Sequence, residues 1–346
     1  MTIKKVAELA GVSTGTVDRV IYHRGRVSDK TIQKVENIIK KYNFTPNPIA
    51  RRLQRGRTYR LCALIPKREQ DSGYWNQIWD GLNRASLDIA PIGVETEIIE
   101  FDRYDSASFN QSVQIIFSKE PDGVAFSPIQ LREMRMFIDS LRHRNIPYVF
   151  FDADMPDTSP LCAIGQDSFK GGYLAGRLLH LFAGRVERPV AIMDVHSEDY
   201  HIIRRRDGFL QYSQEHRFET LVKEFSNNRG VELSNEKIAA FLSEYPELQG
   251  VFVTNASAHR IAEAAMEIKS RRDFFIVGYD LVTANHRLLQ EGMIDAIIAQ
   301  QPETQSRQAL EYLFRAVSMD MRAPPRVEIP LSIFIKENAP LQFLTV

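Results

Sequence analysis

The sequence predicts two parts of different fold class: an all-α helix-turn-helix domain at the N-terminus, then an α/β domain with two lobes and parallel sheets. Three observations lead to this prediction. Three short amphipathic patterns, each with a capping residue, open the chain. From Tyr59 onward, β-branched or aromatic runs alternate with segments of helical length, as in parallel sheets covered by helices. The 346 residues also exceed what one small core requires.

The charge is unevenly distributed, although the whole chain carries 44 basic and 44 acidic residues. Residues 1–60 contain fourteen Lys and Arg but only four Asp and Glu, an excess of ten positive charges. The remainder therefore carries an excess of ten negative charges. A basic segment on an acidic body indicates a polyanionic partner, whereas a solvated basic surface without a partner is the alternative.

The basic segment is expected to contain three helices. Thr2 can cap the first helix and Gly11 can end it, and Ser13 and Ser28 can cap the second and the third. Helical spacing defines the side chains that face the core. These are Val6, Leu9, Ala10, Val17, Val20, Ile21, Ile32, Val35, Ile39 and Tyr42.

Three helices with one tight turn at Gly11 form a helix-turn-helix unit. On the second helix Thr14, Gly15, Asp18 and Arg19 point away from the predicted core. Such a face can enter the major groove of DNA, and the basic excess favours nucleic acid. A three-helix domain without a nucleic-acid partner is the alternative.

A short segment, TPNPIARRLQRG, follows this unit. Asn47 can cap a helix in which Pro48 takes the first position. The predicted helix, residues 47–54, is shorter than the ~12–15 residues that an isolated helix needs in water, so we expect it to form only when a partner holds it. Its arginines, Arg51 among them, favour phosphate as that partner. A plain linker is the alternative.

Residues 1–57 resemble the DNA-binding headpiece of the LacI/GalR (lactose-repressor) family of bacterial transcriptional regulators. The stretches VAELAGVSTGTVDRVI, GRVSDKTIQKV and NFTPNPIARRL carry the resemblance. It implies that the second helix reads bases and that Ala50 and Leu53 enter the minor groove, where Leu53 would wedge between base pairs. The residues expected to contact DNA are Thr14, Gly15, Thr16, Arg19, Asn47, Ala50, Arg51 and Leu53.

Nine apolar runs in the larger part predict strands, with amphipathic helices between them. The runs are LCALIP, VETEIIEF, DGVAFSP, PYVFFD, PVAIMDV, ETLVKEF, GVFVTN, FFIVGYD and DAIIAQ.

Ligands of parallel α/β lobes bind beyond the carboxyl ends of the strands, so the residues that follow the strands are candidates. Carboxylates, amides and a guanidinium would hydrogen-bond vicinal hydroxyls, and aromatic rings would stack on C–H surfaces. Each has a structural alternative: the aspartates could be turn residues, Arg205 a surface ion pair and Trp75 a core residue. Lys67 and Arg68 could meet a phosphate or uronate. The candidates are Tyr74, Trp75, Asp152, Arg205, Asn255, Asp280 and Gln300.

Residues 60–340 resemble, more loosely, the type I periplasmic-binding-protein-like effector domain of the same family, with ribose binders nearest. The stretches YWNQIWDGL, IPYVFFD, RRDGF, VTNA, VGYD and IIAQQP carry this resemblance. It implies that the seven candidates bind ligand and that the chain crosses three times between lobes. We expect a headpiece over residues 1–57 and an effector-binding and dimerisation domain over 59–346. Lobe one would hold about 60–164 and 300–328, and lobe two about 165–299 and 329–346.

Enzyme chemistry has no support in the sequence. It lacks a dinucleotide fingerprint, a phosphate loop, a zinc-protease motif and a nucleophile elbow, so no catalytic residue and no cofactor are expected. The stretch DVHSEDYH holds His196, Glu198, Asp199 and His201, but their spacing fits no standard metal site. A polar loop at the edge of the cleft is favoured instead.

Two observations favour a cytoplasmic location. Cys62 and Cys162 lie in apolar surroundings, as buried thiols in a reducing compartment do. No run is long enough to span a membrane, and MTIKKVAELAGVS lacks the apolar region of a secretory signal.

These expectations combine into one hypothesis. The protein would be a homodimer, or a higher oligomer, that binds double-stranded operator DNA of nearly palindromic sequence. It would act as a repressor, respond to a small polar ligand such as a sugar or sugar derivative, and have no membrane partner. The alternative is a solute-binding receptor or a sugar-acting enzyme with a basic N-terminal extension.

Overall fold

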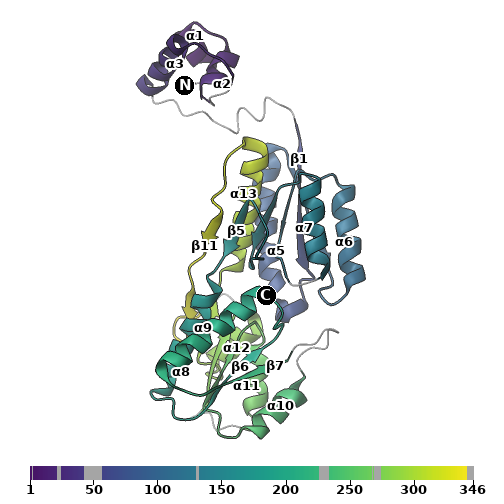
Figure 1. The fold of residues 1–346 in the computed structure, drawn as a ribbon, viewed down its shortest axis with the longest axis vertical. Coiled ribbons are helices and arrows are strands. Elements are labelled where there is room, and N and C mark those ends of the chain that lie inside the picture. The colour runs from purple at the N-terminus through teal and green to yellow at the C-terminus, as the bar shows by residue number, and fades with distance from the viewer. Residues whose placement is uncertain are drawn as a thin grey trace. The chain divides into compact units, whose positions relative to one another are not determined.

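The structure is a computed structural model that describes residues 1, 3–21, 25–42, 57–129, 132–225, 234–266, 268 and 274–340. The chain forms two compact units, Met1–Arg57 and Thr58–Val346, which are described separately (Figure 1).

The first unit contains the three predicted helices, α1 (Ile3–Ala10), α2 (Thr14–Ile21) and α3 (Asp29–Lys41). Its buried core consists of Val6, Ala7, Ala10, Val17, Val20 and Val35.

The prediction that Leu9 and Tyr42 belong to the core of this unit is wrong. Leu9 is 40% exposed, because the inward face of α1 runs through Val6, Ala7 and Ala10 and leaves Leu9 to one side. Tyr42 is 47% exposed, because α3 ends at Lys41 and the stripe does not continue.

The turns between the three helices follow the predicted capping only in part. Gly11 adopts a φ of +63°, a conformation that glycine tolerates without strain. The Ser13 hydroxyl accepts a hydrogen bond from the Thr16 N–H at 3.1 Å, as a helix cap does. The Ser28 hydroxyl instead pairs with the Thr31 hydroxyl at 2.9 Å and accepts no backbone N–H. The predicted helix over residues 47–54, with Asn47, Ala50, Arg51 and Leu53, lies outside the described residues.

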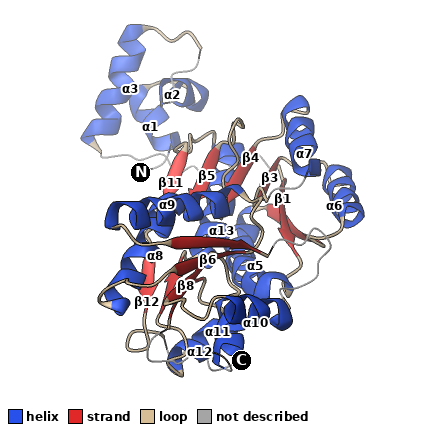
Figure 2. Cartoon of the chain, turned by 60° about the horizontal axis from the view of Figure 1, so that its bottom comes forward, coloured by secondary structure: helices blue, strands red, loops and turns tan. Residues whose placement is uncertain are grey.

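The second unit contains two six-stranded sheets (Figures 1 and 2). Sheet one, in spatial order β11-β5-β4-β3-β1-β2, consists of β1 (Tyr59–Pro66), β2 (Val94–Phe101), β3 (Gly123–Phe126), β4 (Tyr148–Phe151), β5 (Cys162–Gly165) and β11 (Arg326–Glu328). Sheet two, in spatial order β12-β10-β9-β8-β6-β7, consists of β6 (Val190–Asp194), β7 (Thr220–Glu224), β8 (Gly250–Val253), β9 (Phe275–Tyr279), β10 (Ala296–Ala299) and β12 (Ser332–Phe334).

All nine predicted strands are confirmed, and the pairing is parallel except between β10 and β12. The prediction missed β5, β11 and β12. These strands are three or four residues long, and β11 and β12 are largely unburied, so they lack a clear apolar run.

Helices cover the strands in both lobes (Figure 2). They are α5 (Gln70–Ile89), η1 (Ala90–Ile92), α6 (Ser106–Ser118), α7 (Arg132–His143), α8 (Ser168–Ala183), α9 (Tyr200–His216), α10 (Asn235–Glu244), α11 (Ala258–Met266), α12 (Thr283–Gln290) and α13 (Pro302–Met319). The chain crosses between the two sheets three times, after β5, β10 and β11. The second crossing brings α13 back to lobe one, where it packs on α5 and sheet one.

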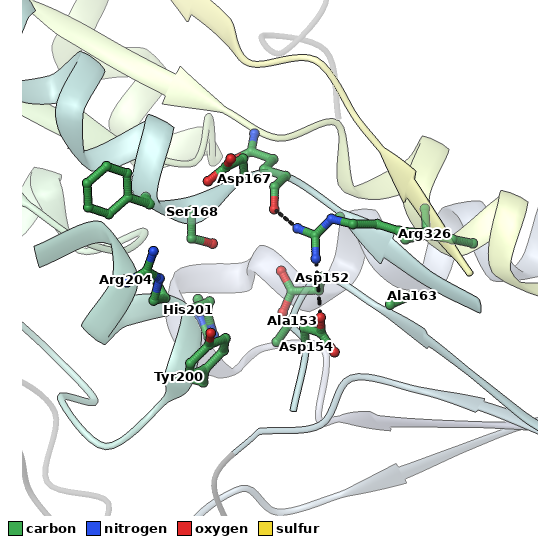
Figure 3. A pocket seen from close by; sticks show the side chains of 14 residues that line it. Asp152, Ala153, Asp154, Ala163, Asp167, Ser168, Tyr200, His201, Arg204 and Arg326 are labelled. Carbon is green, nitrogen blue, oxygen red and sulfur yellow. Dashed lines mark hydrogen bonds and ion pairs between the residues drawn. The ribbon is translucent and has the colours of Figure 1, made fainter. Parts of the chain in front are cut away.

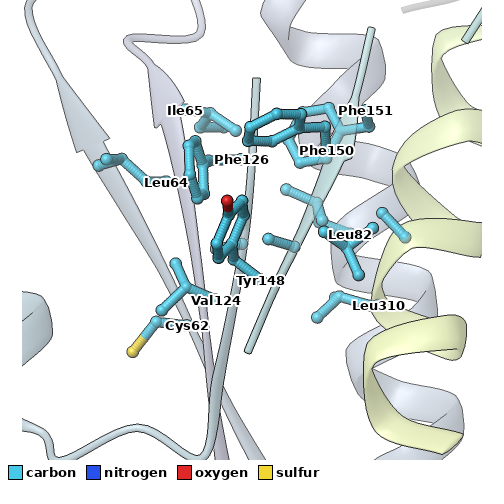
Figure 4. Close-up of a cluster of buried hydrophobic side chains, with 14 of the residues drawn as sticks. Cys62, Leu64, Ile65, Leu82, Val124, Phe126, Tyr148, Phe150, Phe151 and Leu310 are labelled. Atoms are coloured by element: carbon cyan, nitrogen blue, oxygen red, sulfur yellow. The ribbon is translucent and has the colours of Figure 1, made fainter. Parts of the chain in front are cut away.

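The core of lobe one lies between sheet one and helices α5 and α13 (Figure 4). Phe126 and Phe150 meet edge to face with ring centroids 5.2 Å apart, and Leu82 and Leu310 lie on the helix side. Cys62 is buried in this core, as predicted, and burial raises the pKa of its thiol to about 12. Cys162 is buried as well, and burial raises its thiol pKa to about 11.

Among the residues that the structure describes, no helix combines the length and the apolar character needed to cross a membrane.

Candidate functional site

The predicted DNA-reading face is the outer side of α2. Thr14, Gly15 and Arg19 are exposed there, and the Arg19 guanidinium can donate bidentate hydrogen bonds to a guanine edge. Thr16 is partly buried, and its hydroxyl bonds to the Ser13 hydroxyl at 3.0 Å. Thr16 therefore holds the start of α2, and the other three residues are free to approach bases.

In lobe one, Asp152 follows β4, and its carboxylate accepts hydrogen bonds from two hydroxyl groups. Its Oδ1 accepts a hydrogen bond from the Tyr74 hydroxyl at 2.6 Å, and its Oδ2 accepts one from Ser127 at 3.0 Å. Gln305 of α13 fixes the backbone, because its Oε1 accepts the Asp152 N–H at 2.8 Å. Tyr74 of α5 and Asp152 after β4, which were separate candidates, are thus brought together.

Trp75 lies in the core of lobe one, which was the structural alternative for this residue. It is 1% exposed, and its ring meets Tyr74 edge to face with centroids 5.3 Å apart. Its indole N–H donates to Asp71 Oδ2 at 2.7 Å. Trp75 therefore supports the position of Tyr74 and Asp71, and presents almost no surface to a ligand in this conformation.

In lobe two, Arg205, Gln300 and Asp280 form a buried chain of hydrogen bonds. Arg205 donates from Nη2 to Gln300 Oε1 at 3.2 Å, and Gln300 donates from Nε2 to Asp280 Oδ1 at 2.9 Å. Arg205 also donates to the carbonyl of Thr254 at 2.8 Å and lies 3.6 Å above the Tyr279 ring. The structure thus brings together one residue of α9 and the residues that follow β10 and β9, which were separate candidates in the sequence.

The two halves of the site influence each other electrostatically. Burial raises the pKa of Asp280 from 3.8 to about 7, Arg205 opposes the rise, and the negative charge of Asp152 adds to it. Burial also raises the pKa of Tyr74, and Asp152 and Asp280 add to that rise. Carboxylates of both lobes therefore influence each other in one low-dielectric region, and the Arg205 guanidinium offsets part of their repulsion.

Asn255 stands apart from the other candidates. Its Oδ1 accepts the Ser257 N–H at 3.1 Å, a local turn of the kind that asparagine commonly makes. Its side chain thus shapes the turn before α11.

A cavity of about 240 Å³ opens beside Asp152, between the ends of β4 and β5 and the starts of α8 and α9 (Figure 3). Asp152 is the only one of the seven candidates among its lining residues. His201 and Tyr200 of α9 line it from lobe two. The sequence pattern predicts His201 in a polar loop at the edge of the cleft, but this residue lies in the first turn of α9 and lines the cavity.

An ion cluster links the two lobes, and the sequence marks only two of its members, His196 and Asp199, as part of a polar loop. Arg103, in the loop after β2, pairs with Asp71 of lobe one at 2.6 Å and with Asp199 of lobe two. His196 bonds to Asp71 at 3.2 Å, and Tyr104 lies beside it. Burial opposes ionisation of Asp71, but Arg103 and His196 hold its pKa well below the usual range.

Two further features of the loops bear on the expected ligand chemistry. Lys67 and Arg68, candidates for an anionic ligand group, are instead paired with Asp102 at 2.9 Å and Glu100 at 3.1 Å. The described residues contain no group of three or more His, Cys, Asp or Glu that could hold a metal ion.

A small helix-turn-helix domain followed by two α/β lobes around a polar cleft defines the class: bacterial regulators with a binding-protein-like domain. Comparison with known families agrees. Residues 2–47 match "Bacterial regulatory proteins, lacI family", and residues 62–319 match "Periplasmic binding protein domain". The chain therefore carries a lacI-family DNA-binding domain at its N-terminus, and its larger part belongs to the periplasmic binding protein domain family. Both resemblances inferred from the sequence are confirmed.

Individual relatives support this assignment. The chain is 29% identical over 179 residues to the HTH-type transcriptional regulator DegA of Bacillus subtilis, which covers 51% of each protein. It thus spans about half the length of this relative. It is 25% identical to the HTH-type transcriptional repressor PurR of Mannheimia succiniciproducens, covering 97% of this chain and 98% of PurR.

Solved structures show the same fold. A protein assigned as a LacI transcriptional regulator from Bacteroides fragilis is 28% identical, with a TM-score of 0.74 over 82% of this chain and 98% of that one. GanP, a glucose-galactose binding protein from Geobacillus stearothermophilus, is 21% identical, with a TM-score of 0.72 over 82% of this chain and 100% of GanP. At that identity the likeness concerns the fold alone.

Proposed function

We propose that this protein is a ligand-responsive, sequence-specific DNA-binding transcription regulator that acts in the cytoplasm as a homodimeric repressor. One observation carries the proposal: a lacI-type helix-turn-helix domain with an exposed reading face shares a chain with a two-lobed binding domain. The excess of ten positive charges in residues 1–60 supports binding to a polyanion. Several relatives are named as transcriptional regulators or repressors, among them DegA and PurR.

The proposed ligand is a small polar molecule, a sugar or sugar derivative, held between the lobes. Asp152 and Asp280 offer carboxylate acceptors, and Arg205 and Gln300 offer planar donors, which together suit neighbouring hydroxyl groups. Asn255 and Trp75 contribute to this site through the turn and the core that position it.

Coupling follows from the position of the site. Its carboxylates belong to different lobes, so a ligand that contacts both favours one angle between them. The chain enters lobe one directly at β1, after the segment 47–54. In a dimer, a changed angle would alter the distance between the two such segments and so the affinity for an operator with two half-sites.

The test is direct selection of DNA. The full-length protein is mixed with a pool of random duplexes, and bound sequences are recovered, sequenced and measured by fluorescence anisotropy. We expect an approximately palindromic sequence that binds at least a thousandfold more tightly than random DNA. Failure to enrich any sequence would contradict the proposal.

A matched pair of variants separates base reading from general attraction. Arg19→Ala should weaken binding to the selected sequence more than binding to random DNA, since Arg19 is expected to contact bases. Lys40→Ala removes an exposed positive charge from α3 and should affect both duplexes equally and weakly. Equal losses for Arg19→Ala on both duplexes would place Arg19 on phosphates instead.

A further inference from the structure

The cavity of about 240 Å³ next to Asp152 is lined mostly by residues outside the hydrogen-bonded groups described above. Tyr74, Asp280, Gln300 and Arg205 do not line it. It extends from Asp152 toward the crossover between β5 and α8 (Figure 3). The space is therefore a neighbour of the central site, joined to it through one shared aspartate.

The walls of the cavity carry groups that suit a hydroxylated ring. Nδ1 of His201 is buried and has no hydrogen-bond partner within the described part of the chain. A buried nitrogen without a partner costs free energy unless a ligand or water supplies one. Tyr200 lies beside it with 38% exposure, and Phe169 adds a second aromatic ring. The Ser168 side chain points toward the same space (Figure 3).

The charges in the cavity argue against an anionic occupant. Three carboxylates line it, those of Asp152, Asp154 and Asp167, against the guanidinium groups of Arg204 and Arg326. Arg326 is paired with Asp154 at 3.2 Å, and Arg204 with Asp207 at 3.4 Å. Burial, together with the charge of the nearby Arg205, lowers the pKa of His201 to about 4, so the imidazole is neutral at physiological pH. A neutral ring nitrogen suits a hydroxyl group, which can both donate and accept.

The volume limits the size of the occupant. At about 240 Å³, the cavity is smaller than the roughly 300 Å³ at which pockets for drug-sized ligands begin. It can therefore hold one small ring, and a larger ligand would have to occupy the central site as well.

We propose that this cavity is a second sugar subsite, so that the ligand is a disaccharide with one ring in the central site and the other against His201, Tyr200 and Ser168. This inference rests on the proposed function, because it names the ligand of the same cleft. Asp152, which lines the cavity and also accepts the hydrogen bond of Tyr74, would then lie near the glycosidic link.

The experiment compares disaccharides with their own component sugars. The full-length protein is titrated calorimetrically with sucrose, maltose, lactose, cellobiose and trehalose, and with glucose, fructose and galactose. We expect at least one disaccharide to bind at least tenfold more tightly than either of its components. Binding of the components at equal or higher affinity than every disaccharide would overturn the proposal, as would the absence of binding by any of these sugars.

Variants then test the assigned cavity. His201→Ala should weaken the disaccharide by about tenfold, the loss of one buried hydrogen bond, and change the component sugar less than twofold. Ser168→Phe should remove the preference for the disaccharide by filling the space, without deleting a buried group. His143→Ala, the same change at an exposed position of α7, is the matched control. Equal loss for both sugar classes in His201→Ala and Ser168→Phe would overturn the second subsite.

Failure of this inference is separable from failure of the proposed function. Selection of operator DNA on the same preparation reports on the headpiece and requires no sugar. If DNA selection succeeds but no disaccharide binds more tightly than its component sugars, the proposed regulatory function is supported and the second sugar subsite is rejected.

Discussion

Asp152 and Asp280 occupy matching positions in the two lobes. Each follows a buried strand, and each adopts a positive φ, +69° and +63°, which aspartate tolerates better than most residues. Their N–H groups bond to the carbonyls of Ile164 and Ile298 on the adjacent strands. The same left-handed backbone conformation at the end of a strand therefore positions one carboxylate in each lobe.

The first prediction concerns the ionisation of Asp280. Its pKa is raised from 3.8 to about 7 in the folded protein, so the folded state holds a proton that the unfolded state releases. Stability should therefore fall as pH rises from about 4 to about 7, with a slope on the order of 1 kcal/mol per pH unit from this group, and level off above. Asp280→Asn should remove that slope, and asparagine also tolerates the positive φ.

Urea unfolding of wild type and Asp280→Asn across this pH range measures the effect. The variant should gain stability relative to wild type as pH rises. Asp139→Asn, at an exposed position of α7, reports the general effect of the same change. A difference between wild type and Asp280→Asn that stays constant from pH 4 to 8 would show that Asp280 does not hold the proton.

The second prediction concerns Arg205, which is 1% exposed and donates to Gln300 and the Thr254 carbonyl. Arg205→Ala should leave operator affinity without ligand nearly unchanged, since α2 and α3 are remote in the chain. The ligand concentration for half-response should rise about tenfold or more, because a buried polar ligand group loses its partner. Operator binding titrated with ligand measures both quantities.

Arg287→Ala serves as the control for Arg205, because Arg287 is a half-exposed surface residue of lobe two paired with Glu263. It should respond to ligand as wild type does. Loss of operator binding by folded Arg205→Ala without ligand would mean that Arg205 supports the DNA-binding conformation instead.

At the scale of elements, the contact between α8 and α9 determines where Arg205 lies. A Cβ on Gly172 would come within 1.7 Å of the Arg205 carbonyl oxygen, and one on Gly208 within 2.0 Å of the Phe169 carbonyl oxygen. Only glycine at both positions lets the two helix backbones approach this closely. The glycines of RRDGF and SFKGG therefore act through packing.

The third prediction follows from the close contact between the backbones of α8 and α9. Gly208→Ala must push α9 away from α8, which should cost about 1–3 kcal/mol of stability and displace Arg205 from Gln300. Thermal unfolding of the larger unit and the ligand concentration for half-response should both change. Gln111→Ala, at an exposed position of α6 in the same unit, is the control. Unchanged stability in Gly208→Ala would show that the helices have room to separate.

At the scale of the second unit, the cluster of Asp71, Arg103 and Asp199 ties lobe one to lobe two. The three side chains are 8%, 10% and 5% exposed, so their charges are largely removed from water. A buried ion triad holds only while all its members are present, because loss of one leaves the others unpaired. The angle between the lobes in this structure thus depends on this buried ion cluster.

The fourth prediction concerns Arg103→Met, which keeps much of the side-chain volume and removes the charge. Asp71 and Asp199 would then repel each other across the cleft, and the lobes should separate. Small-angle scattering of the ligand-free protein should show a larger radius of gyration, and ligand affinity should fall because closure becomes costlier. Arg84→Met removes an exposed ion pair with Glu303 and should change neither quantity. An unchanged radius in Arg103→Met would show that other contacts keep the lobes closed.

The sequence by itself determined the helices of the headpiece and the nine main strands. Both rest on local signals: capping serines, glycine at the turn, and apolar runs bounded by polar residues. It also located most of the site, because in a parallel sheet the residue after each strand lies at the same edge whatever the lobe. Asp152, Asp280 and Gln300 were found in this way.

Only the tertiary structure decided which of these residues meet. Arg103 and Asp199 are 96 positions apart, and no local pattern marks such a pair. The same holds for Tyr74 with Asp152, and for the cavity beside His201, whose walls come from both lobes. Long-range contacts depend on how sheets and helices pack, and packing is a property of the whole unit. The sequence therefore names the chemical groups of the cleft, and the fold determines their partners.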